Sequence, residues 1–256
     1  MKKSFLTSSV LAGYGLMTGL QAAPQQKPNV LLIVCDDLND YVTGFGGHPQ
    51  ARTPHIEKFA KTATAFRRAY SNCPVCAPSR SSFLTGIAPW TSRALGWPTW
   101  YKHKVLKNCY SLAEQFRRHG YRVVGSGKLM HHVKPELWDE YPHKPDYGPF
   151  VFDGKKRVAH PSVPEPFRSI GPVDGSFAPL EDIPFANDNN PKSGWIYGTW
   201  GKIRPFQVRP DGTRSLTPDE INAKWAAERL HRFAAERSDK PFFMGVGFIR
   251  PHTPLH

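Results

Sequence analysis

The segment at residues 72–86, NCPVCAPSRSSFLTG, holds the residues whose types and spacing are best suited to chemistry. Two residues separate Cys73 from Cys76, which is the spacing of a redox dithiol or of half a zinc site. The run from Cys76 through Arg80 to Gly86 instead looks like a site where one cysteine is singled out for chemistry. These two interpretations are incompatible, and other parts of the sequence bear on the choice.

The remaining cysteines favour the second interpretation. A zinc site needs a second closely spaced pair of Cys or His residues, whereas Cys35 and Cys109 are single and far away. Four cysteines in 256 residues do not make a disulfide scaffold, although an exported protein is permitted disulfides. A thioredoxin-like dithiol would follow a core strand, and residues 64–72 could serve as that strand. The redox interpretation is therefore weakened and stays open.

Several charged and imidazole side chains come directly after apolar runs typical of strands. They are Asp36 and Asp37 after residues 30–35, Lys128, His131 and His132 after residues 121–126, and Arg250 and His252 after residues 242–248. In an open α/β sheet, ligands bind beyond the carboxyl ends of the strands. These side chains are therefore predicted to meet at one edge of a sheet.

The residue types at this edge suit the transfer of an anionic group. Adjacent carboxylates such as Asp36 and Asp37 suit a hard divalent cation such as Ca²⁺, which takes about six to eight oxygen ligands. A cation, a lysine and an arginine would neutralise charge on an oxyanion, and a histidine would protonate the leaving group. Each residue alone has a simpler explanation, since paired Asp residues cap turns and most loop histidines lie at the surface. The convergence of these residues favours the catalytic explanation.

The strands that must hold this edge are indicated by their composition. Continuous apolar runs at residues 30–35 and 242–248 suit strands buried on both faces, and residues 121–126 follow a helix as another strand. Residues 65–70 are a further candidate. Because strands that alternate with helices form parallel sheets, the sequence predicts an α/β fold. We expect a mostly parallel sheet with helices on both faces.

Start signals mark three helices between these strands. Thr53 followed by proline predicts a helix that runs to about Lys61, with the threonine as N-cap. Capping boxes at residues 111–114 and 217–220 open two more helices, the first of which ends at Gly120.

Residues 133–216 have a different composition. This stretch holds 13 of the 25 prolines and shows little periodicity. We interpret it as a loop-rich insertion at about 133–216, packed over the sheet and shaping a binding cleft. A partly disordered excursion is the alternative.

The N-terminus resembles a secretory signal peptide. Two lysines, Lys2 and Lys3, precede an apolar stretch at residues 5–20, and Ala22 and Ala23 offer a cleavage point. We expect residues 1–23 to be removed and residues 24–256 to form the mature chain, exported to the periplasm or the extracellular space. No other segment is long enough to cross a bilayer, so no membrane span is expected.

The charge of the chain favours anionic partners. The net charge is +13, and removal of Lys2 and Lys3 leaves 32 basic and 21 acidic residues, or +11. Nucleic acid, sulfated polysaccharide and acidic surfaces all suit this charge. For an exported protein we expect a sulfated polysaccharide and no nucleic acid.

Residues 76–86, CAPSRSSFLTG, resemble the signature of the formylglycine-dependent sulfatase family, a C-x-P-S-R motif followed by L-T-G. The resemblance extends from Asn29 to His256. Within the family, GKLMH at residues 127–131 and FFMGVGFIRPH at residues 242–252 are most similar to iduronate-2-sulfatase-like members. The implied fold is that of the sulfatases and alkaline phosphatases.

The resemblance implies a modified cysteine and a metal ion. A formylglycine-generating enzyme would oxidise Cys76 to 3-oxoalanine (formylglycine), so that Cys76 could not pair with Cys73. The hydrated aldehyde offers one hydroxyl to attack sulfur and a second to expel sulfate later. Asp36, Asp37 and the formylglycine oxygen would hold one Ca²⁺.

The resemblance also implies roles for the remaining site residues. Arg80 would orient the hydrate, and Lys128 would clamp both the hydrate and the sulfate. His131 would serve as a base or an orienting residue at the hydrate. His252 would bind sulfate and protonate the leaving alcohol, whereas His132 matches no family position.

The implied function is a sulfuric ester hydrolase that removes sulfate from sulfated sugars or polysaccharide, with uronate 2-sulfates as candidates. Family members carry a further D-H or D-N pair and a further lysine, which have no match up to His256. We therefore expect the N-terminal portion of a sulfatase catalytic domain, truncated before its C-terminal part, with exposed edge strands. The alternatives are a phosphate or phosphonate monoester hydrolase of the same superfamily, an inactive glycan-binding module and a dithiol oxidoreductase.

Overall fold

The computed structural model describes residues 26–43, 45–182, 193–198, 203–236 and 238–256. The expected signal peptide at residues 1–23 lies outside the described residues. The strands are β1 (Val30–Cys35), β2 (Arg122–Gly127), β3 (Phe150–Phe152), β4 (Arg157–Val158), β5 (Gly194–Ile196) and β6 (Phe242–Phe248). The α-helices are α1 (Pro54–Ala60), α2 (Cys76–Thr85), α3 (Pro89–Ser92), α4 (Leu112–Arg118) and α5 (Pro218–Glu236). Short 3₁₀ helices lie at Trp100–Lys102, Leu106–Asn108, Pro135–Leu137 and Phe167–Ile170.

The main sheet contains the three strands predicted at residues 30–35, 121–126 and 242–248. They pair in parallel in the order β1-β6-β2, with β6 in the centre. The central place of β6 suits its sequence, FFMGVGF, whose inner five residues are all buried. Cys35 pairs with Phe248, so the strands end at one common edge.

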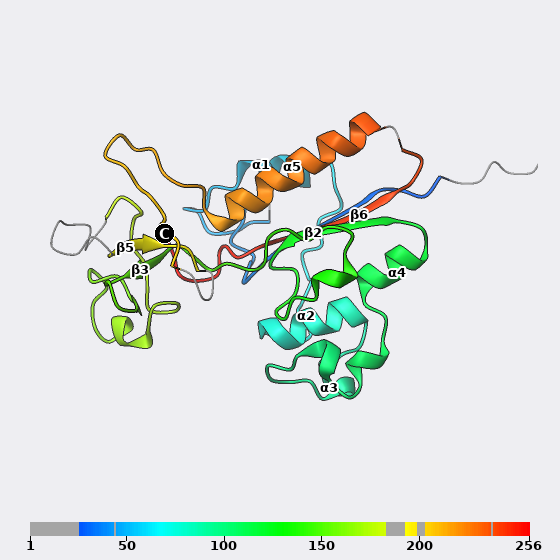
Figure 1. The fold of residues 1–256 in the computed structure, drawn as a ribbon, viewed down its shortest axis with the longest axis horizontal. Coiled ribbons are helices and arrows are strands. Elements are labelled where there is room, and N and C mark those ends of the chain that lie inside the picture. Colours follow the sequence, from blue (N-terminus) through cyan, green and yellow to red (C-terminus); the bar gives the residue numbers. More distant parts are fainter. Residues whose placement is uncertain (1–25, 44, 183–192, 199–202, 237) are drawn as a thin grey trace, which may run out of the picture.

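Helices cover both faces of this sheet, as the sequence predicts. Figure 1 shows α5 on one side of β2 and β6 and α2, α3 and α4 on the other. On the first side, Trp225 of α5 packs with Val124 and Met244. On the second, Phe116 of α4 stacks on Phe243 with ring centroids 4.2 Å apart. Successive residues of a strand point to opposite faces, so Phe243 packs against one helical layer and Met244 against the other.

Both predicted capping boxes are confirmed. The Ser111 hydroxyl accepts from the backbone N–H of Glu114, and the Glu114 carboxylate accepts from the N–H of Ser111 at 2.7 Å. Thr217 and Glu220 make the same exchange at the start of α5. Each box satisfies two N–H groups that have no partner inside the helix. The sequence therefore fixes where α4 and α5 begin.

The strand predicted at residues 65–70 is wrong. These residues form a turn and irregular backbone, and Phe66 and Tyr70 are 75% and 86% exposed. None of the strands in the described part of the chain pairs with this segment, so the local composition does not lead to pairing. Without this strand, the dithiol interpretation of Cys73 and Cys76 loses its structural context.

Helix α2 carries the cysteine motif and is not indicated by any apolar periodicity. It begins at Cys76 and ends where Gly86 adopts a φ of 73°. It buries Arg80, Ser81 and Ser82 as well as Ala77, Pro78 and Leu84, and the hydroxyl of Ser81 donates to the Ala77 carbonyl at 2.7 Å. Because polar and apolar residues share its buried face, α2 shows no apolar stripe in the sequence.

The stretch at residues 133–216 contains a second, smaller sheet. Strand β3 pairs antiparallel with β4 and β5, and Val151, Trp195 and Phe206 form its own apolar cluster. In Figure 1 this sheet lies at the end of the molecule away from α4. The strands are two or three residues long, too short for alternation to be visible in the sequence.

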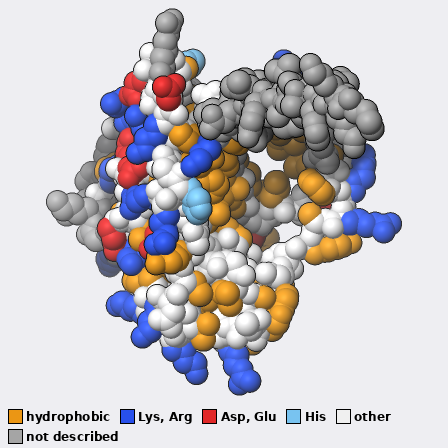
Figure 2. Space-filling view, turned by 90° about the vertical axis from the view of Figure 1, so that its right-hand side faces the viewer, with side chains coloured by type: hydrophobic (Ala, Val, Ile, Leu, Met, Phe, Trp, Pro, Cys, Tyr) orange, Lys and Arg blue, Asp and Glu red, His pale blue; other side chains and the backbone are white. Residues whose placement is uncertain are grey.

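The described surface carries charge and exposed apolar groups together. Lys and Arg side chains are spread over the face in Figure 2, with hydrophobic side chains among them. None of the helices formed by the described residues has the length and hydropathy that crossing a bilayer requires.

Candidate active site

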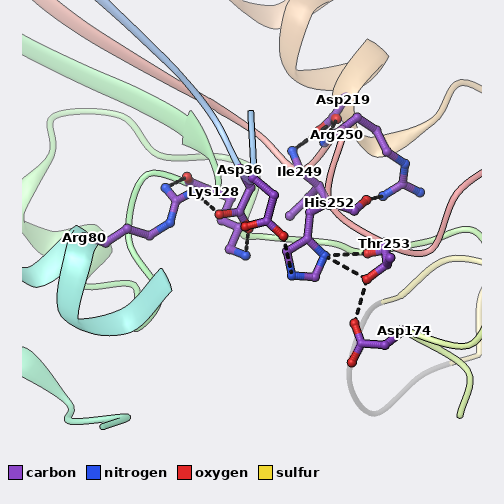
Figure 3. Close-up of polar contacts among 10 residues, drawn as sticks. Asp36, Arg80, Lys128, Asp174, Asp219, Ile249, Arg250, His252 and Thr253 are labelled. Carbon is purple, nitrogen blue, oxygen red and sulfur yellow. Dashed lines mark hydrogen bonds and ion pairs between the residues drawn. The ribbon is translucent and has the colours of Figure 1, made fainter. Parts of the chain in front are cut away.

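Four of the predicted residues, Asp36, Arg80, Lys128 and His252, lie together at the carboxyl edge of the main sheet (Figure 3). Asp36 follows β1, Lys128 follows β2 and Arg80 comes from α2. One Asp36 oxygen accepts from Arg80 Nη2 at 2.8 Å, and the other contacts Lys128 Nζ. Arg80 also donates to the Lys128 carbonyl. All three side chains are buried, so a pair of cations encloses one carboxylate.

Two glycines bring Lys128 to this position. Gly127 has a φ of 77°, a conformation that glycine adopts without strain. A Cβ on Gly247 would overlap the backbone carbonyl of Lys128. The absence of a side chain at residue 247 therefore lets the chain cross the end of β6, where the Lys128 N–H donates to the Gly247 carbonyl at 2.9 Å.

Cys76 is the first residue of α2 and is half-buried. Burial raises the pKa of its thiol, and the Arg80 guanidinium opposes this shift. Together with Asp36, Asp37 and Arg80 it lines a cavity of about 420 Å³. The helix N-terminus and Arg80 favour negative charge in this cavity, which Asp36 and Asp37 also line with their carboxylates.

Asp36, Cys76 and His252 offer ligand atoms that all lie within 4.8 Å of one another. Asp37 is adjacent, with a φ of 55° and a side chain that is 66% exposed. A buried carboxylate such as Asp36 requires positive charge nearby, which a hard cation would add. A thiol is a poor ligand for Ca²⁺, so the donor set fits this ion only when residue 76 carries oxygen.

His252 has one ring nitrogen held and the other available. Its Nδ1 lies 2.7 Å from the Thr253 carbonyl oxygen, which can only accept, so Nδ1 carries a proton. Its Nε2 faces Asp37 Oδ2 at 3.8 Å. The Thr253 hydroxyl in turn donates to Asp174 at 2.7 Å, which ties this turn to the 171–178 loop (Figure 3).

Asp219 fixes the turn that carries His252, a role that the sequence patterns did not indicate. Its carboxylate accepts from the backbone N–H groups of Ile249 and Arg250 at 2.9 and 2.8 Å. Burial raises the pKa of Asp219, and these two hydrogen bonds oppose the shift. The position of Asp219 inside the predicted capping box was the only signal available, and that signal points to a helix start.

Tyr147 is a further site residue with no motif to mark it. Its ring centroid lies 4.4 Å from Lys128 Nζ and 5.2 Å from the ring centroid of His252. Burial raises the pKa of its phenol. The Lys128 ammonium thus lies over the Tyr147 ring, an arrangement that stabilises positive charge.

The two adjacent histidines lie at the side of the site. The His131 ring packs against those of Trp97 and His132, with centroids 4.8 and 4.9 Å apart. Burial lowers the pKa of His131 to about 4, helped by His132 and Lys128. Among the described residues, the Nδ1 atoms of both histidines are buried without a hydrogen-bond partner. His131 therefore presents a neutral ring near the site.

All four cysteines are free thiols in the structure. Cys73 lines the same cavity as Cys76 but is not bonded to it.

Lys128 is almost fully buried, and burial lowers the pKa of its ammonium to about 7, while contact with Asp36 favours the charged form. The site thus contains a free cysteine beside carboxylates, buried cations and an imidazole.

These groups lie at the carboxyl edge of a parallel α/β sheet. The family model described as Sulfatase matches residues 28–256. The chain therefore belongs to the sulfatase family.

Two relatives agree with this assignment. The chain is 29% identical over 236 residues to a sulfatase of Formosa agariphila, covering 90% of this chain and 40% of that protein. It is 30% identical over 231 residues to the iduronate 2-sulfatase of Mus musculus, covering 89% of this chain and 35% of that protein. The chain thus spans less than half the length of these relatives.

A solved structure shares the fold. The crystal structure of Ps i-CgsB superposes with a TM-score of 0.53 at 20% identity, covering 90% of this chain and 46% of that one. The predicted α/β architecture of the sulfatases is confirmed.

Proposed function

We propose that the sulfatase containing this chain removes sulfate from sulfated sugars in the manner of an iduronate-2-sulfatase. In this proposal Cys76 is converted to formylglycine, and Asp36, Asp37 and the formylglycine oxygen hold one Ca²⁺. The convergence of Asp36, Cys76 and His252 within 4.8 Å carries the proposal. When present, the ion and the aldehyde hydrate would supply charge stabilisation and an oxygen nucleophile.

Arg80 and Lys128 bind and orient the anionic group. Both are buried and held by hydrogen bonds before any substrate enters. Preorganised positive charge in a site with little water stabilises charge on an oxyanion more than the same groups do in water. The Tyr147 ring over Lys128 limits where its ammonium can move.

His252 moves the proton. Since Nδ1 is held by the Thr253 carbonyl, only Nε2 can exchange a proton with the substrate. A doubly protonated ring would donate from Nε2 to the oxygen of the leaving alcohol. His131 has a neutral ring above about pH 4 and serves in this proposal as an orienting residue.

Export and maturation belong to the same proposal. We propose that residues 1–23 direct export to the periplasm or the extracellular space, and that a formylglycine-generating enzyme modifies Cys76. The part of residues 133–216 that forms the second sheet would shape the cleft for a sulfated carbohydrate.

The test is sulfate release by the full-length protein produced with a formylglycine-generating enzyme. We expect release from sulfated sugars, a loss of at least about 10³-fold in the Cys76→Ala variant, and a loss on chelation that Ca²⁺ reverses. Mass spectrometry of the tryptic peptide 69–80 would show the thiol-to-aldehyde conversion at Cys76.

Other outcomes would replace the proposal. Faster turnover of aryl phosphate than of aryl sulfate would assign a phosphate or phosphonate monoester hydrolase. Retention on heparin that is unchanged in the Cys76→Ala variant, without turnover of any ester, would assign a glycan-binding module.

A further inference from the structure

A second cavity is also lined by Cys76. It has a volume of about 400 Å³ and shares Cys76 with the cavity that contains Asp36 and Arg80. His252 forms part of its wall. Its size falls in the range of pockets that enclose small ligands.

The arrangement divides a substrate into two parts, provided that the proposed function holds. The anionic group occupies the first cavity, beside Arg80. The oxygen that receives the proton from His252 belongs to the alcohol, so the alcohol must extend into the second cavity. The lining of the second cavity therefore decides which alcohol fits.

One wall of the second cavity is aromatic. Trp97 is 60% exposed although it lines the cavity beside Cys76, and its ring packs on one side against His131. Tyr147 and Phe150 complete this wall. An exposed tryptophan that is held in place by a neighbouring ring offers a rigid, electron-rich face. The polarised C–H groups of a sugar ring pack well on such a face.

The same cavity carries a guanidinium. Arg157 of β4 lines the cavity, with its Cζ 5.1 Å from the centre of the Phe150 ring. A guanidinium matches the paired oxygens of a carboxylate or a sulfate. Asp174 also lines the cavity, but its carboxylate accepts from the Thr253 hydroxyl and belongs to the His252 turn.

We propose that Trp97 and Arg157 determine the substrate specificity of this site. Trp97 stacks on the sugar ring that bears the reacting sulfate, and Arg157 binds a second anionic group on that sugar or its neighbour. The aromatic wall alone would also suit a quaternary ammonium alcohol. Arg157 repels such a cation, and the net charge of +11 that remains without Lys2 and Lys3 acts in the same direction.

The first test compares substrates in the Arg157→Gln variant of the mature full-length protein. The substrates are an aryl sulfate, a neutral hexose sulfate, a sulfated uronate and a disulfated hexose. We expect kcat/KM to fall about 10-fold to 100-fold for the last two, mainly through KM. Turnover of the aryl sulfate should stay within about twofold. The substrate whose kcat/KM falls further shows whether Arg157 binds a carboxylate or a sulfate as the second anion.

A matched control is Arg204→Gln. Arg204 lies over the Tyr197 ring and lines a different cavity. Its replacement should therefore leave kcat/KM unchanged for all four substrates. Equal losses on all four substrates in Arg157→Gln, or no loss on any, would overturn the proposal. So would a preference of the unaltered enzyme for choline sulfate over the sulfated uronate.

The second test needs no turnover. In the Cys76→Ala background, calorimetry with the sulfated uronate should show weaker binding after Trp97→Ala, and partial recovery with Trp97→Phe. Trp90→Ala is the control, because Trp90 is equally exposed at 66% but does not line the cavity. If the protein binds the sugar through Trp97 and Arg157 but never releases sulfate, the proposed function is refuted and the binding roles of these two residues stand. Binding that is insensitive to both residues would refute the specificity proposal.

Discussion

Arg80 has a double task beside Cys76. Its guanidinium donates to the carboxylate of Asp36 and to the carbonyl of Lys128, and it is 4% exposed. It therefore holds the end of β1 and the chain after β2 in one arrangement. Any sulfate site that uses these residues depends on it for geometry as well as for charge.

Replacement of Arg80 by methionine should lower the free energy of unfolding by about 3 kcal/mol, because Asp36 would lose one of its two buried partners. Denaturant unfolding measures this change. Arg68→Met is the control, since Arg68 is exposed and should alter stability by less than about 0.5 kcal/mol. Equal stability of the two variants would show that the buried pair does not hold the site.

His131 should make the protein sensitive to acid. Its folded-state pKa of about 4 lies below the ordinary 6.5, because burial and neighbouring cations disfavour the charged ring. The unfolded chain therefore binds a proton more readily, and stability present above pH 6.5 is lost as the pH falls towards 4. After allowance for solvent screening, the loss from this residue is about 1 to 2 kcal/mol.

The measurement for His131 is the free energy of unfolding between pH 7 and pH 4. His131→Asn should flatten the curve in this window, whereas His48→Asn, at an exposed position, should leave it as it is. An unchanged curve in His131→Asn would mean that other groups cause the acid sensitivity.

At the scale of elements, the first turn of α5 controls the turn after β6. Asp219 of α5 accepts from the backbone N–H groups of Ile249 and Arg250, which stand just before His252. The Arg250 side chain then donates to the carbonyls of His252 and Gly148, both at 3.3 Å. A helix, a strand end and the second sheet are thus joined at one short segment.

Asp219→Asn should reduce kcat about tenfold while KM stays within about twofold, because the turn loses a charged acceptor but the cavity for the anion is intact. Steady-state kinetics of the mature full-length protein measures this. Glu220→Gln is the matched control in the same helical turn, since Glu220 bonds Thr217 and Arg214 and not residues 249–250. A rise in KM without a change in kcat would place Asp219 in binding of substrate.

At the scale of the whole molecule, β1 is an edge strand within the described sheet. Leu31 and Ile33 are 44% and 56% exposed on it. They share the face of Met244 and Val246, whereas Leu32 points to the opposite, packed face. An exposed apolar edge strand favours association with other chains.

Ile33→Lys in the 256-residue chain should reduce concentration-dependent association and change the unfolding free energy by less than about 0.5 kcal/mol. Light scattering and denaturant unfolding measure the two effects. Leu32→Lys, one residue earlier, should instead destabilise the fold by more than about 2 kcal/mol, because it places a charge against the core. Association that is unchanged by Ile33→Lys would place the contact surface elsewhere.

The sequence by itself determined the parts of this protein that depend on local physics. The three core strands and the two capping boxes follow from apolar runs and from hydrogen bonds within four residues. Helix α1 begins at Pro54 as predicted, although the Thr53 side chain makes no capping hydrogen bond. The meeting of Asp36, Lys128 and His252 also follows, because parallel strands end at one edge. The cysteine motif indicated the family because all its residues lie on one segment of the sequence.

Only the tertiary structure decided the remainder. Helix α2 buries polar and apolar residues together, and β3 to β5 are short strands stabilised by partners up to 46 residues away. Several contacts of the site join segments far apart in the chain. They are the contact of Tyr147 with Lys128, the hydrogen bond from the Arg250 N–H to Asp219, and the shared cavity of Trp97 and Arg157. Such contacts depend on how layers pack, and a local pattern of residue types carries no information about that packing.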